Sequence, residues 1–448
     1  ALPRRLVERT AFDLGVSVAD ARDTLDGDGF EVGLNLVDGS GAARPGTDWA
    51  PGGGLEPCLP PRRVSTEWAD AAWIDASEPA PASRAVAAIL ERSLAGTPPT
   101  RDEVEVLFAA RGDDVTAIAD AADRLRQERV GDTVTYVINR NINYTNLCYF
   151  RCGFCAFSKG PRSLNLRGEP YLMGLDEIVD LATEAVDKGA TEVTLQGGIH
   201  PDFTGNFYVD VVRALKEVHP DLHLHGFTPL EVWQGAETLG TTVPAFLEEL
   251  RDAGLGSLPG TAAEILDDDV RLHLCPDKIR SAQWASVMRT AHGLGLGSTA
   301  TVMFGHIDGP ASWANHVEVI RRVQADTGGF TEFVPLPFVH MGSPIWLRGQ
   351  SRPGPTWDEV VLMHAVPRLA FDGLIANIQA SWVKLGVTGG QRLLDAGCND
   401  FGGTLMGEII TRSAGAAQAQ EMTPVEFEDA IRGVGRRPAQ RTTRYLSL

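Results

Sequence analysis

The sequence predicts an α/β fold in which parallel strands close, or nearly close, into a barrel of the TIM type. After Gly131, short strand-like runs alternate repeatedly with longer amphipathic helical segments. Such alternation is typical of parallel sheets, and a long series of these units favours a barrel. Glycine and polar strings follow several of the strand-like runs, at the strand ends where barrels carry their chemistry.

The chain before the predicted barrel divides into two parts. Residues 1–82 form a linker-like region of unassigned role, since the segment 78–82 (Glu-Pro-Ala-Pro-Ala) has the composition of a linker. Residues 83–130 are predicted to form a helical N-terminal extension, because apolar residues recur with helical spacing from Val86 onward.

The barrel is predicted over residues 131–410, and its strands are expected where β-branched and apolar runs are bounded by turn residues. The strand candidates are 133–138, 192–195, 222–225, 257–260, 298–304, 332–338 and 375–380. Amphipathic helices between them include 176–188, 209–218, 282–294 and 313–324. Residues 411–448 are expected to form a C-terminal helical tail.

The composition excludes several classes of protein. The chain has 448 residues, 43% of them apolar, so a large core is possible. The net charge of −19 argues against nucleic acid as the partner, because binders of the phosphate backbone carry a basic face. No apolar run approaches the roughly 20 residues that span a bilayer. Three of the six cysteines crowd together, which indicates a metal site in a reducing cytoplasm rather than a disulfide scaffold.

These three cysteines follow the first predicted strand directly. Cys148, Cys152 and Cys155 have the spacing C-x3-C-x2-C. Three thiolates this close can bind three irons of a 4Fe-4S cluster and leave the fourth iron open, whereas electron-transfer clusters usually have four cysteine ligands. An open iron can bind a small chelating molecule, and S-adenosylmethionine (SAM) offers an amino group and a carboxylate for this purpose.

Two other uses of the cysteines are chemically reasonable. A zinc site could combine them with Cys275, Cys398 or a histidine, giving a zinc-stabilised binding protein without catalysis. A redox disulfide could join Cys152 and Cys155. Structural zinc sites usually pair two short ligand clusters, and the sequence holds no second cluster.

The cysteine spacing, with an aromatic residue before the last cysteine, resembles the signature of the radical SAM superfamily. Phe154 occupies the aromatic position. The resemblance implies that this ring packs near the adenine of SAM. The alternative is ordinary packing in the core, and one ring can do both.

Longer strings narrow the resemblance to one subfamily. Over residues 83–448 the chain resembles the tyrosine-using half of FO synthase, which makes the deazaflavin chromophore of coenzyme F-420. The matching strings are Asn139–Asn146, Gln196–Phe203, Pro259–Leu266, Met303–His306, Glu332–His340, Gln379–Lys384, Asn399–Thr404 and Gln440–Tyr445. Residues 1–82 match nothing in that group and contain no second cysteine loop.

The resemblance assigns several residues to cofactor binding. Gln196, Gly197 and Gly198 end a strand where glycine lets backbone approach a ligand, and the resemblance implies contact with the amino group of SAM. A tight turn is the alternative. Glu264 is expected to bind the ribose hydroxyls of SAM, or else to begin a helix, where a carboxylate is favoured by the helix dipole.

A set of polar residues is expected to bind substrate at the barrel mouth. Alternation along one strand places three asparagines on one face, where unpaired amides would be costly. The candidates are Asn139, Asn141, Asn143, His225, Glu231, His306, His340, Gln379, Ser381 and Lys384. For each of them alone, a structural hydrogen bond is the competing interpretation.

The resemblance implies a reaction and a rival. A 5'-deoxyadenosyl radical would take hydrogen from L-tyrosine, whose Cα–Cβ bond then breaks to leave 2-iminoacetate. The 4-hydroxybenzyl group would couple to 5-amino-6-(D-ribitylamino)uracil, and a second, cyclising radical SAM enzyme would complete FO. The rival is a radical SAM enzyme of the futalosine route to menaquinone.

Overall fold

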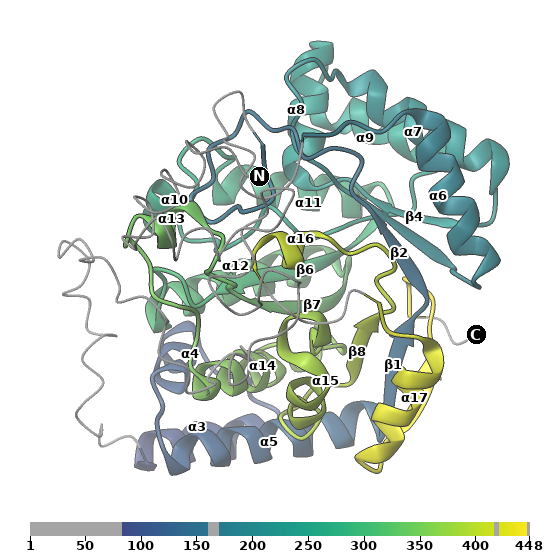
Figure 1. Cartoon of the computed structure of the whole chain (residues 1–448). Helices are drawn as coiled ribbons and strands as arrows, with labels where there is room; N and C mark the ends of the chain where they lie inside the picture. The colour runs from purple at the N-terminus through teal and green to yellow at the C-terminus, as the bar shows by residue number, and fades with distance from the viewer. Residues whose placement is uncertain (1–82, 160–169, 416–420, 446–448) are drawn as a thin grey trace, which may run out of the picture.

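The computed structural model describes residues 83–159, 170–415 and 421–445. Among the described residues, three helices precede the first strand, within the range 83–130 where the sequence predicts a helical extension. They are α3 (Ser83–Leu94), α4 (Arg101–Phe108) and α5 (Asp113–Val130). Thr100 and Glu103 form a capping box that starts α4, and the buried apolar faces of the helices pack on the barrel (Figure 1).

A six-stranded parallel sheet forms most of the barrel. Its strands, in spatial order, are β2 (Asn139–Ile142), β3 (Glu192–Leu195), β4 (His223–Gly226), β5 (Ser257–Leu258), β6 (Gly297–Phe304) and β7 (Phe330–Pro337). The strand order follows the chain order, as right-handed strand–helix–strand units produce. All four residues of β3 are buried, because helices cover one face of the sheet and side chains fill the other.

A smaller parallel sheet completes the circle of strands. It contains β8 (Asp400–Gly403), β1 (Thr133–Val137) and β9 (Arg437–Gln440), in that order. Residues Ile378 and Gln379 bridge β7 to β8, and Met406 bridges back to Arg140 in β2. Hydrogen-bonded bridges therefore link the two sheets on both sides, which confirms the predicted barrel-like α/β fold.

Several strand boundaries differ from the sequence expectation. The first predicted strand ends at Val137, and a separate strand, β2, begins at Asn139 and pairs with another sheet. Its sequence, Asn-Arg-Asn-Ile, has a single apolar residue, Ile142, and so carries little of the pattern that identifies strands. Residues 375–380 form isolated bridges rather than the predicted strand.

Amphipathic helices form the outer layer of the barrel (Figure 1). The long ones are α6 (Leu175–Asp187), α7 (Gly205–Val218), α8 (Pro229–Leu239), α9 (Val243–Ala253), α11 (Ser281–Gly293), α12 (Pro310–Thr327), α14 (Trp357–Ala370) and α15 (Trp382–Leu393). In α6, Ile178, Ala182 and Ala185 recur with helical spacing and are all buried. Shorter helices are α10 (Asp268–Leu274), α13 (Pro344–Leu347), α16 (Ile410–Ser413) and α17 (Pro424–Gly433).

The C-terminal tail is not wholly helical, contrary to expectation. After α17 the chain forms β9, which pairs with β1 along four residues. The segment Arg-Pro-Ala-Gln carries little strand signal, and its pairing with β1 supplies the backbone hydrogen bonds instead. Residues 441–445 then enter the barrel interior near the amino ends of β3 and β8.

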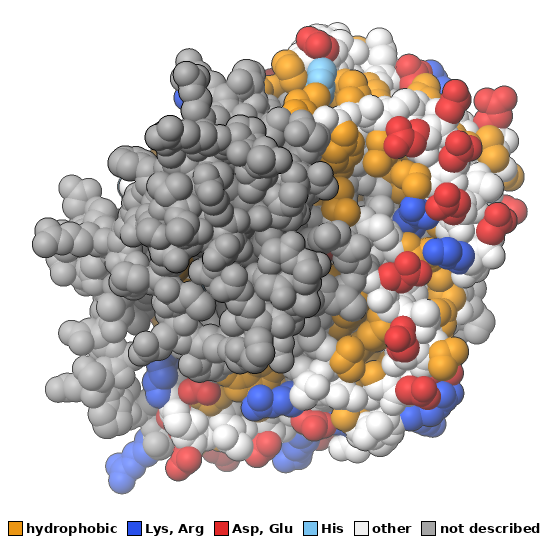
Figure 2. Space-filling view, in the orientation of Figure 1, with side chains coloured by type: hydrophobic (Ala, Val, Ile, Leu, Met, Phe, Trp, Pro, Cys, Tyr) orange, Lys and Arg blue, Asp and Glu red, His pale blue; other side chains and the backbone are white. Residues whose placement is uncertain are grey.

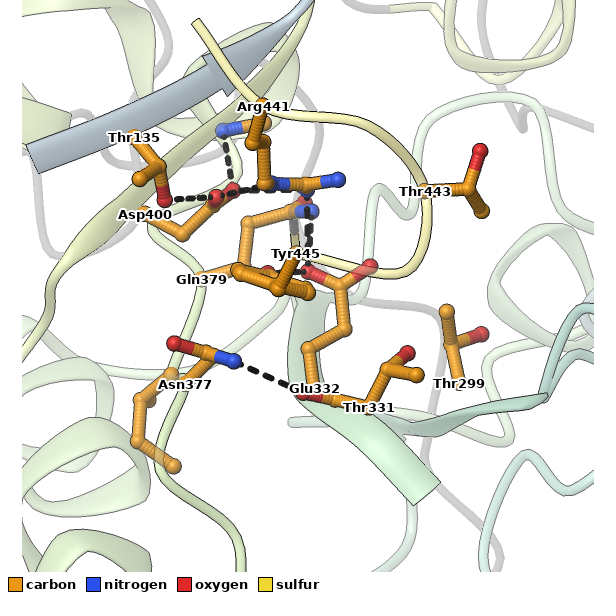
Figure 3. Close-up of polar contacts among 12 residues, drawn as sticks. Thr135, Thr299, Thr331, Glu332, Asn377, Gln379, Asp400, Arg441, Thr443 and Tyr445 are labelled. Carbon is orange, nitrogen blue, oxygen red and sulfur yellow. Dashed lines mark hydrogen bonds and ion pairs between the residues drawn. The ribbon is translucent and has the colours of Figure 1, made fainter. Parts of the chain in front are cut away.

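Figure 3 shows the buried polar cluster that this tail completes. Arg441 donates to Asp400 (Nε to Oδ2, 2.5 Å) and to Glu332 (Nη2 to Oε2, 3.3 Å). The hydroxyl of Tyr445 donates to the same Glu332 oxygen at 2.6 Å, and its ring lies 4.1 Å from the Arg441 guanidinium. Thr443 bonds to Glu192. Burial, partly opposed by Arg441, raises the pKa of Glu332 to about 7.

Arg441→Met is expected to lower the free energy of unfolding by roughly 3–5 kcal/mol, because it leaves buried carboxylates without their cation. Urea unfolding followed by circular dichroism measures this loss. The loss should be smaller at pH 5 than at pH 8, because a protonated Glu332 needs no cation. Burial raises the pKa of Glu332 to about 7, so the stability that this group contributes in its protonated form is lost as pH rises through about 7. The exposed Arg437, replaced by Met, is the matched control; equal losses in both variants would contradict the prediction.

Charged side chains are not gathered into one patch on the described part of the face that Figure 2 shows. On the described part of the face in Figure 2, acidic and basic side chains are interspersed with apolar ones. Within the described ranges, no helix is both long enough and apolar enough to cross a membrane.

Candidate active site

The cysteine loop begins just beyond the carboxyl end of β2. Cys148, Cys152 and Cys155 are free thiols, each partly buried. The N–H of Cys148 donates to the carbonyl of Lys159 (2.9 Å), and the N–H of Gly153 donates to the carbonyl of Leu274 (2.8 Å). The first bond closes the loop on itself, and the second fixes it to a distant part of the chain, at the end of the barrel where chemistry is expected.

The Gln196–Gly198 segment leaves β3 against the start of this loop. The N–H of Gly198 donates to the carbonyl of Thr145 at 2.8 Å. A Cβ atom on Gly198 would lie 2.2 Å from the carbonyl oxygen of Leu147 and 3.0 Å from the Cβ of Cys148. Glycine is therefore required here so that the strand end can approach the cysteine loop itself.

A buried carboxylate, that of Glu231, holds the backbone of Gly197 in place. Glu231 accepts from the N–H of Gly197 (3.1 Å) and from the hydroxyl of Tyr144, and it also caps α8 through the N–H of Thr228 (2.7 Å). A Cβ on Gly197 would meet the ring of Tyr144 at 2.5 Å. Glu231 was predicted to bind substrate at the mouth. In the structure both of its carboxylate oxygens accept hydrogen bonds from the protein, so its role here is structural.

Gln196 and Asn143 meet at the carboxyl ends of β2 and β3. The Asn143 Nδ2 donates to the carbonyl of Gln196 (3.1 Å), and the Gln196 side chain accepts from Thr261 (3.1 Å). Asn143 is 2% exposed, and its Oδ1 has no hydrogen-bond partner among the described residues. A buried acceptor without a partner is costly, so this oxygen is suited to a ligand N–H or O–H.

Glu264 lies in a strained turn after β5, not at a helix start. Its φ is 47°, and Ala262 has a φ of 68°. Residues with side chains rarely adopt this region, and they do so mainly where surrounding structure enforces it. The enforcing group is Arg271, whose buried guanidinium donates to the carbonyls of Ala262 (3.3 Å), Ala263, Ile265 (3.2 Å) and Ile279 (2.5 Å).

Lys278 connects this turn to the cysteine loop. Its Nζ lies 2.6 Å from Oε1 of Glu264 and 5.4 Å from the centroid of the Phe154 ring. Burial opposes the charge, but the Glu264 carboxylate and the nearby Cys152 raise the pKa of Lys278. The cation therefore stays protonated beside two groups that the sequence assigns to cofactor binding.

The residues present fit an open 4Fe-4S cluster. Three free, partly buried thiols on one loop supply one ligand to each of three irons, and Lys278 supplies positive charge beside them. The zinc alternative needs ligands that converge on one ion. No three His, Cys, Asp or Glu side chains in the described ranges are grouped in that way.

The other predicted site residues fall into two places. Asn139, His225 and Gln379 belong to the interior around the buried polar cluster, where they bond to Glu192 (3.1 Å), Ser257 (2.7 Å) and Glu332 (3.2 Å) respectively. Burial lowers the pKa of His225 to about 4, so this ring is neutral. These three lie away from the mouth because each precedes the carboxyl end of its strand or bridge.

The remaining predictions are spread over two loops, the start of a helix and one strand. His306 is buried and bonds to backbone within its own turn, at the carbonyl of Met303 (3.0 Å). His340 is buried and meets the ring of Trp346 edge-on, with centroids 4.6 Å apart. Ser381 begins α15, and Asn141, on β2, is partly buried.

Sequence reasoning missed Lys278 and Arg271. Both follow Glu264 by fewer than fifteen residues, but neither belongs to a glycine or polar string at a strand end. The available signal was that two basic residues occur in a segment, 264–278, rich in acidic residues, but such residues usually form ion pairs at the surface.

Comparisons with known proteins agree with this geometry. Residues 142–320 match the radical SAM superfamily, and residues 327–447 match the CofH/MqnC C-terminal region. The chain is 46% identical over 360 residues to the 5-amino-6-(D-ribitylamino)uracil--L-tyrosine 4-hydroxyphenyl transferase of Methanothermobacter thermautotrophicus, covering 80% of this chain and 97% of that protein. It is 47% identical over 355 residues to the FO synthase of Mycobacterium leprae, covering 79% of this chain but 40% of that protein.

Solved structures share the fold at low sequence identity. Methylornithine synthase (PylB) superposes with a TM-score of 0.60 at 18% identity, covering 78% of this chain and 97% of that one. The hydrogenase maturase HydG superposes with a TM-score of 0.62 at 13% identity, covering 81% and 78%. The superfamily uses a 4Fe-4S cluster and SAM, for which the cysteine loop is suited. By sequence, the chain belongs to the radical SAM family that contains the 5-amino-6-(D-ribitylamino)uracil–L-tyrosine 4-hydroxyphenyl transferases and the FO synthases.

Proposed function

We propose that this chain transfers the 4-hydroxybenzyl group of L-tyrosine to 5-amino-6-(D-ribitylamino)uracil, a step in making FO. The observation that carries this proposal is the length of the match. It covers 97% of the Methanothermobacter transferase but only 40% of the Mycobacterium FO synthase. The chain thus corresponds to a whole transferase and to one part of the larger enzyme. In this reaction tyrosine loses its Cα–Cβ bond, and the two-carbon remainder leaves as 2-iminoacetate.

The site residues divide the work in a way that suits this reaction. When bound, the cluster and SAM supply the 5'-deoxyadenosyl radical that starts the reaction, and the protein's side chains do not have to generate it. Cys148, Cys152 and Cys155 would hold the cluster, and Gln196–Gly198 with Glu264 would hold SAM beside it. The barrel excludes water, and polar groups at the mouth, such as the free Oδ1 of Asn143, orient the substrates.

The match over nearly the whole length of the transferases favours the proposed reaction over the futalosine-pathway alternative, whereas the match to the C-terminal family does not. The matching C-terminal family covers both CofH and MqnC proteins, so it does not separate them.

The proposed transferase reaction also needs a partner enzyme for the ring closure, and the described residues hold a single cysteine loop. We place both steps in the cytoplasm, where free thiols persist.

The purified, anaerobically reconstituted chain is expected to convert tyrosine and the ribitylaminouracil into a coupled adduct. With SAM and a reductant it should also form 5'-deoxyadenosine and 2-iminoacetate, the latter seen as glyoxylate after hydrolysis. Fluorescent deazaflavin should appear only after the second, cyclising enzyme is added, because one cluster site is unsuited to two different radical steps.

Mass spectrometry of products and deazaflavin fluorescence measure this outcome, with a chain lacking all three cluster cysteines as control. Fluorescence from the chain alone would contradict the division of labour. Consumption of a futalosine-type substrate, with none of the ribitylaminouracil, would favour the menaquinone rival.

A further inference from the structure

Lys384 occupies an unusual position at the barrel mouth. It lies in the first turn of α15, directly after residues 377–380, which bridge β7 and β8. Helical geometry breaks at Gly386, where φ is 70° and ψ is 166°. Lys384 therefore lies on a single turn between the bridged segment 377–380 and a glycine break, and its side chain reaches Thr411 on α16.

The Lys384 ammonium is partly buried and poorly neutralised. Its Nζ donates to the hydroxyl of Thr411 at 3.0 Å. That hydroxyl in turn donates to Glu408 Oε1 at 3.1 Å. Among the described residues, no carboxylate oxygen lies within 4.0 Å of the ammonium, and the neutral Thr411 hydroxyl stands between it and Glu408. One neutral partner leaves much of the cost of burying an ammonium uncompensated.

Other partly buried cations near the mouth have their charge matched. Lys278 pairs with Glu264 at 2.6 Å, and Arg352 pairs with Glu359 at 2.7 Å. Lys384 has no such pair, and burial lowers its pKa while the more distant charges of Glu408 and Glu264 oppose that shift. Glu264 thus lies within electrostatic range of Lys384, which connects this lysine to the proposed ribose end of SAM.

A second polar group lies at the start of the same turn. Ser381 precedes Lys384 by three residues, is 4% exposed, and makes no capping hydrogen bond to α15. The N–H of Lys384 donates to the carbonyl of Ser381 at 3.1 Å, so the two residues close one turn of chain. The ammonium and the hydroxyl together offer two donors to one small anionic group.

We propose that Lys384 and Ser381 bind the α-carboxylate of the amino-acid substrate. This inference rests on the proposed function, in which tyrosine brings the anion. Of the other reactants, the ribitylaminouracil is uncharged, and the carboxylate of SAM has the open iron of the cluster as its ligand. Lys384 thereby fixes the amino-acid end of tyrosine near the carbon radical and leaves the phenol end free to transfer.

Equilibrium dialysis tests this binding without turnover. Labelled L-tyrosine and labelled tyramine, which lacks the carboxylate, are dialysed anaerobically against the cluster-loaded, unreduced protein with SAM present. The wild type is expected to bind tyrosine about 30-fold more tightly than tyramine, as a charge-assisted hydrogen bond provides. In Lys384→Met the ratio should fall to near one, because the Kd of tyrosine rises while that of tyramine stays within about twofold.

Three further variants sharpen the test. Lys384→Arg should keep part of the preference for tyrosine, and Ser381→Ala should lose a smaller part of it. Lys188→Met is the matched control, since Lys188 is exposed at the end of α6 and should leave the ratio unchanged. The visible absorbance of the cluster should be the same in all four variants.

Two results would overturn the inference. The first is a wild type that binds tyrosine and tyramine equally. The second is a Lys384→Met protein that keeps the tyrosine preference or weakens both ligands alike, as a purely structural lysine would. Failure of the proposed function shows separately, as absence of adduct from the reduced wild type, whatever the dialysis ratios are.

Discussion

Cys152→Ala is expected to abolish 5'-deoxyadenosine formation, a loss of more than about 1,000-fold in rate. Each cubane corner needs its own thiolate, and a three-cysteine site has none to spare. Burial raises the pKa of the Cys152 thiol, and the Lys278 ammonium opposes that rise. Anaerobic reconstitution, iron and sulfide content, and liquid chromatography of 5'-deoxyadenosine measure the effect.

The matched control is Cys398→Ala. Cys398 is fully buried, and the preceding carbonyl of Gly397 accepts from Arg368 at 2.8 Å, so its loss removes a thiol without touching the loop. It should retain near-normal iron content and nucleoside formation. Normal 5'-deoxyadenosine production by Cys152→Ala would show that the three-cysteine assignment is wrong, and equal losses in both variants would point to misfolding instead.

The sequence predicted those strands that are rich in β-branched residues. Strands β3 (Glu-Val-Thr-Leu) and β6 (Gly-Ser-Thr-Ala-Thr-Val-Met-Phe) were located closely because Val and Thr favour strands. Strand β2 was missed because its polar residues are satisfied by β3 and by the segment around Met406, contacts that only the folded chain reveals. Strand β9 was missed for the same reason, since its pairing with β1 joins residues about 300 positions apart.

In the candidate site too, features encoded by local spacing were predicted, and features that depend on the folded chain were not. Local spacing predicted the cysteine loop and the glycine strand end, which the structure brings into contact. The row of asparagines was interpreted as one substrate face, but Asn139 bonds to Glu192 in the interior while Asn143 lies at the mouth. Strand alternation gives the face of a side chain and not its depth in the barrel, so period alone could not separate these two residues.

Gly198→Ala is expected to prevent stable assembly of the cluster, although this glycine is not a ligand. Its added Cβ would lie 2.2 Å from the carbonyl oxygen and 2.7 Å from the carbonyl carbon of Leu147, the residue before Cys148. Both atoms are backbone, so the clash cannot be relieved by a side-chain rotation and must displace the loop or the end of β3. Iron content after reconstitution should fall to less than about a third of the wild-type value.

A graded glycine series makes this prediction specific. Gly174→Ala should be neutral, because Gly174 precedes α6 with nothing within 4 Å of its Cβ position. Gly197→Ala should be intermediate, since its Cβ would meet the side-chain ring of Tyr144, which can shift slightly. If Gly198→Ala instead loaded its cluster fully and lost only SAM affinity, the glycine would serve the cofactor directly, as the family resemblance alone implies. Loss of iron would show that the strand end first builds the cysteine loop, and that SAM binding depends on that support.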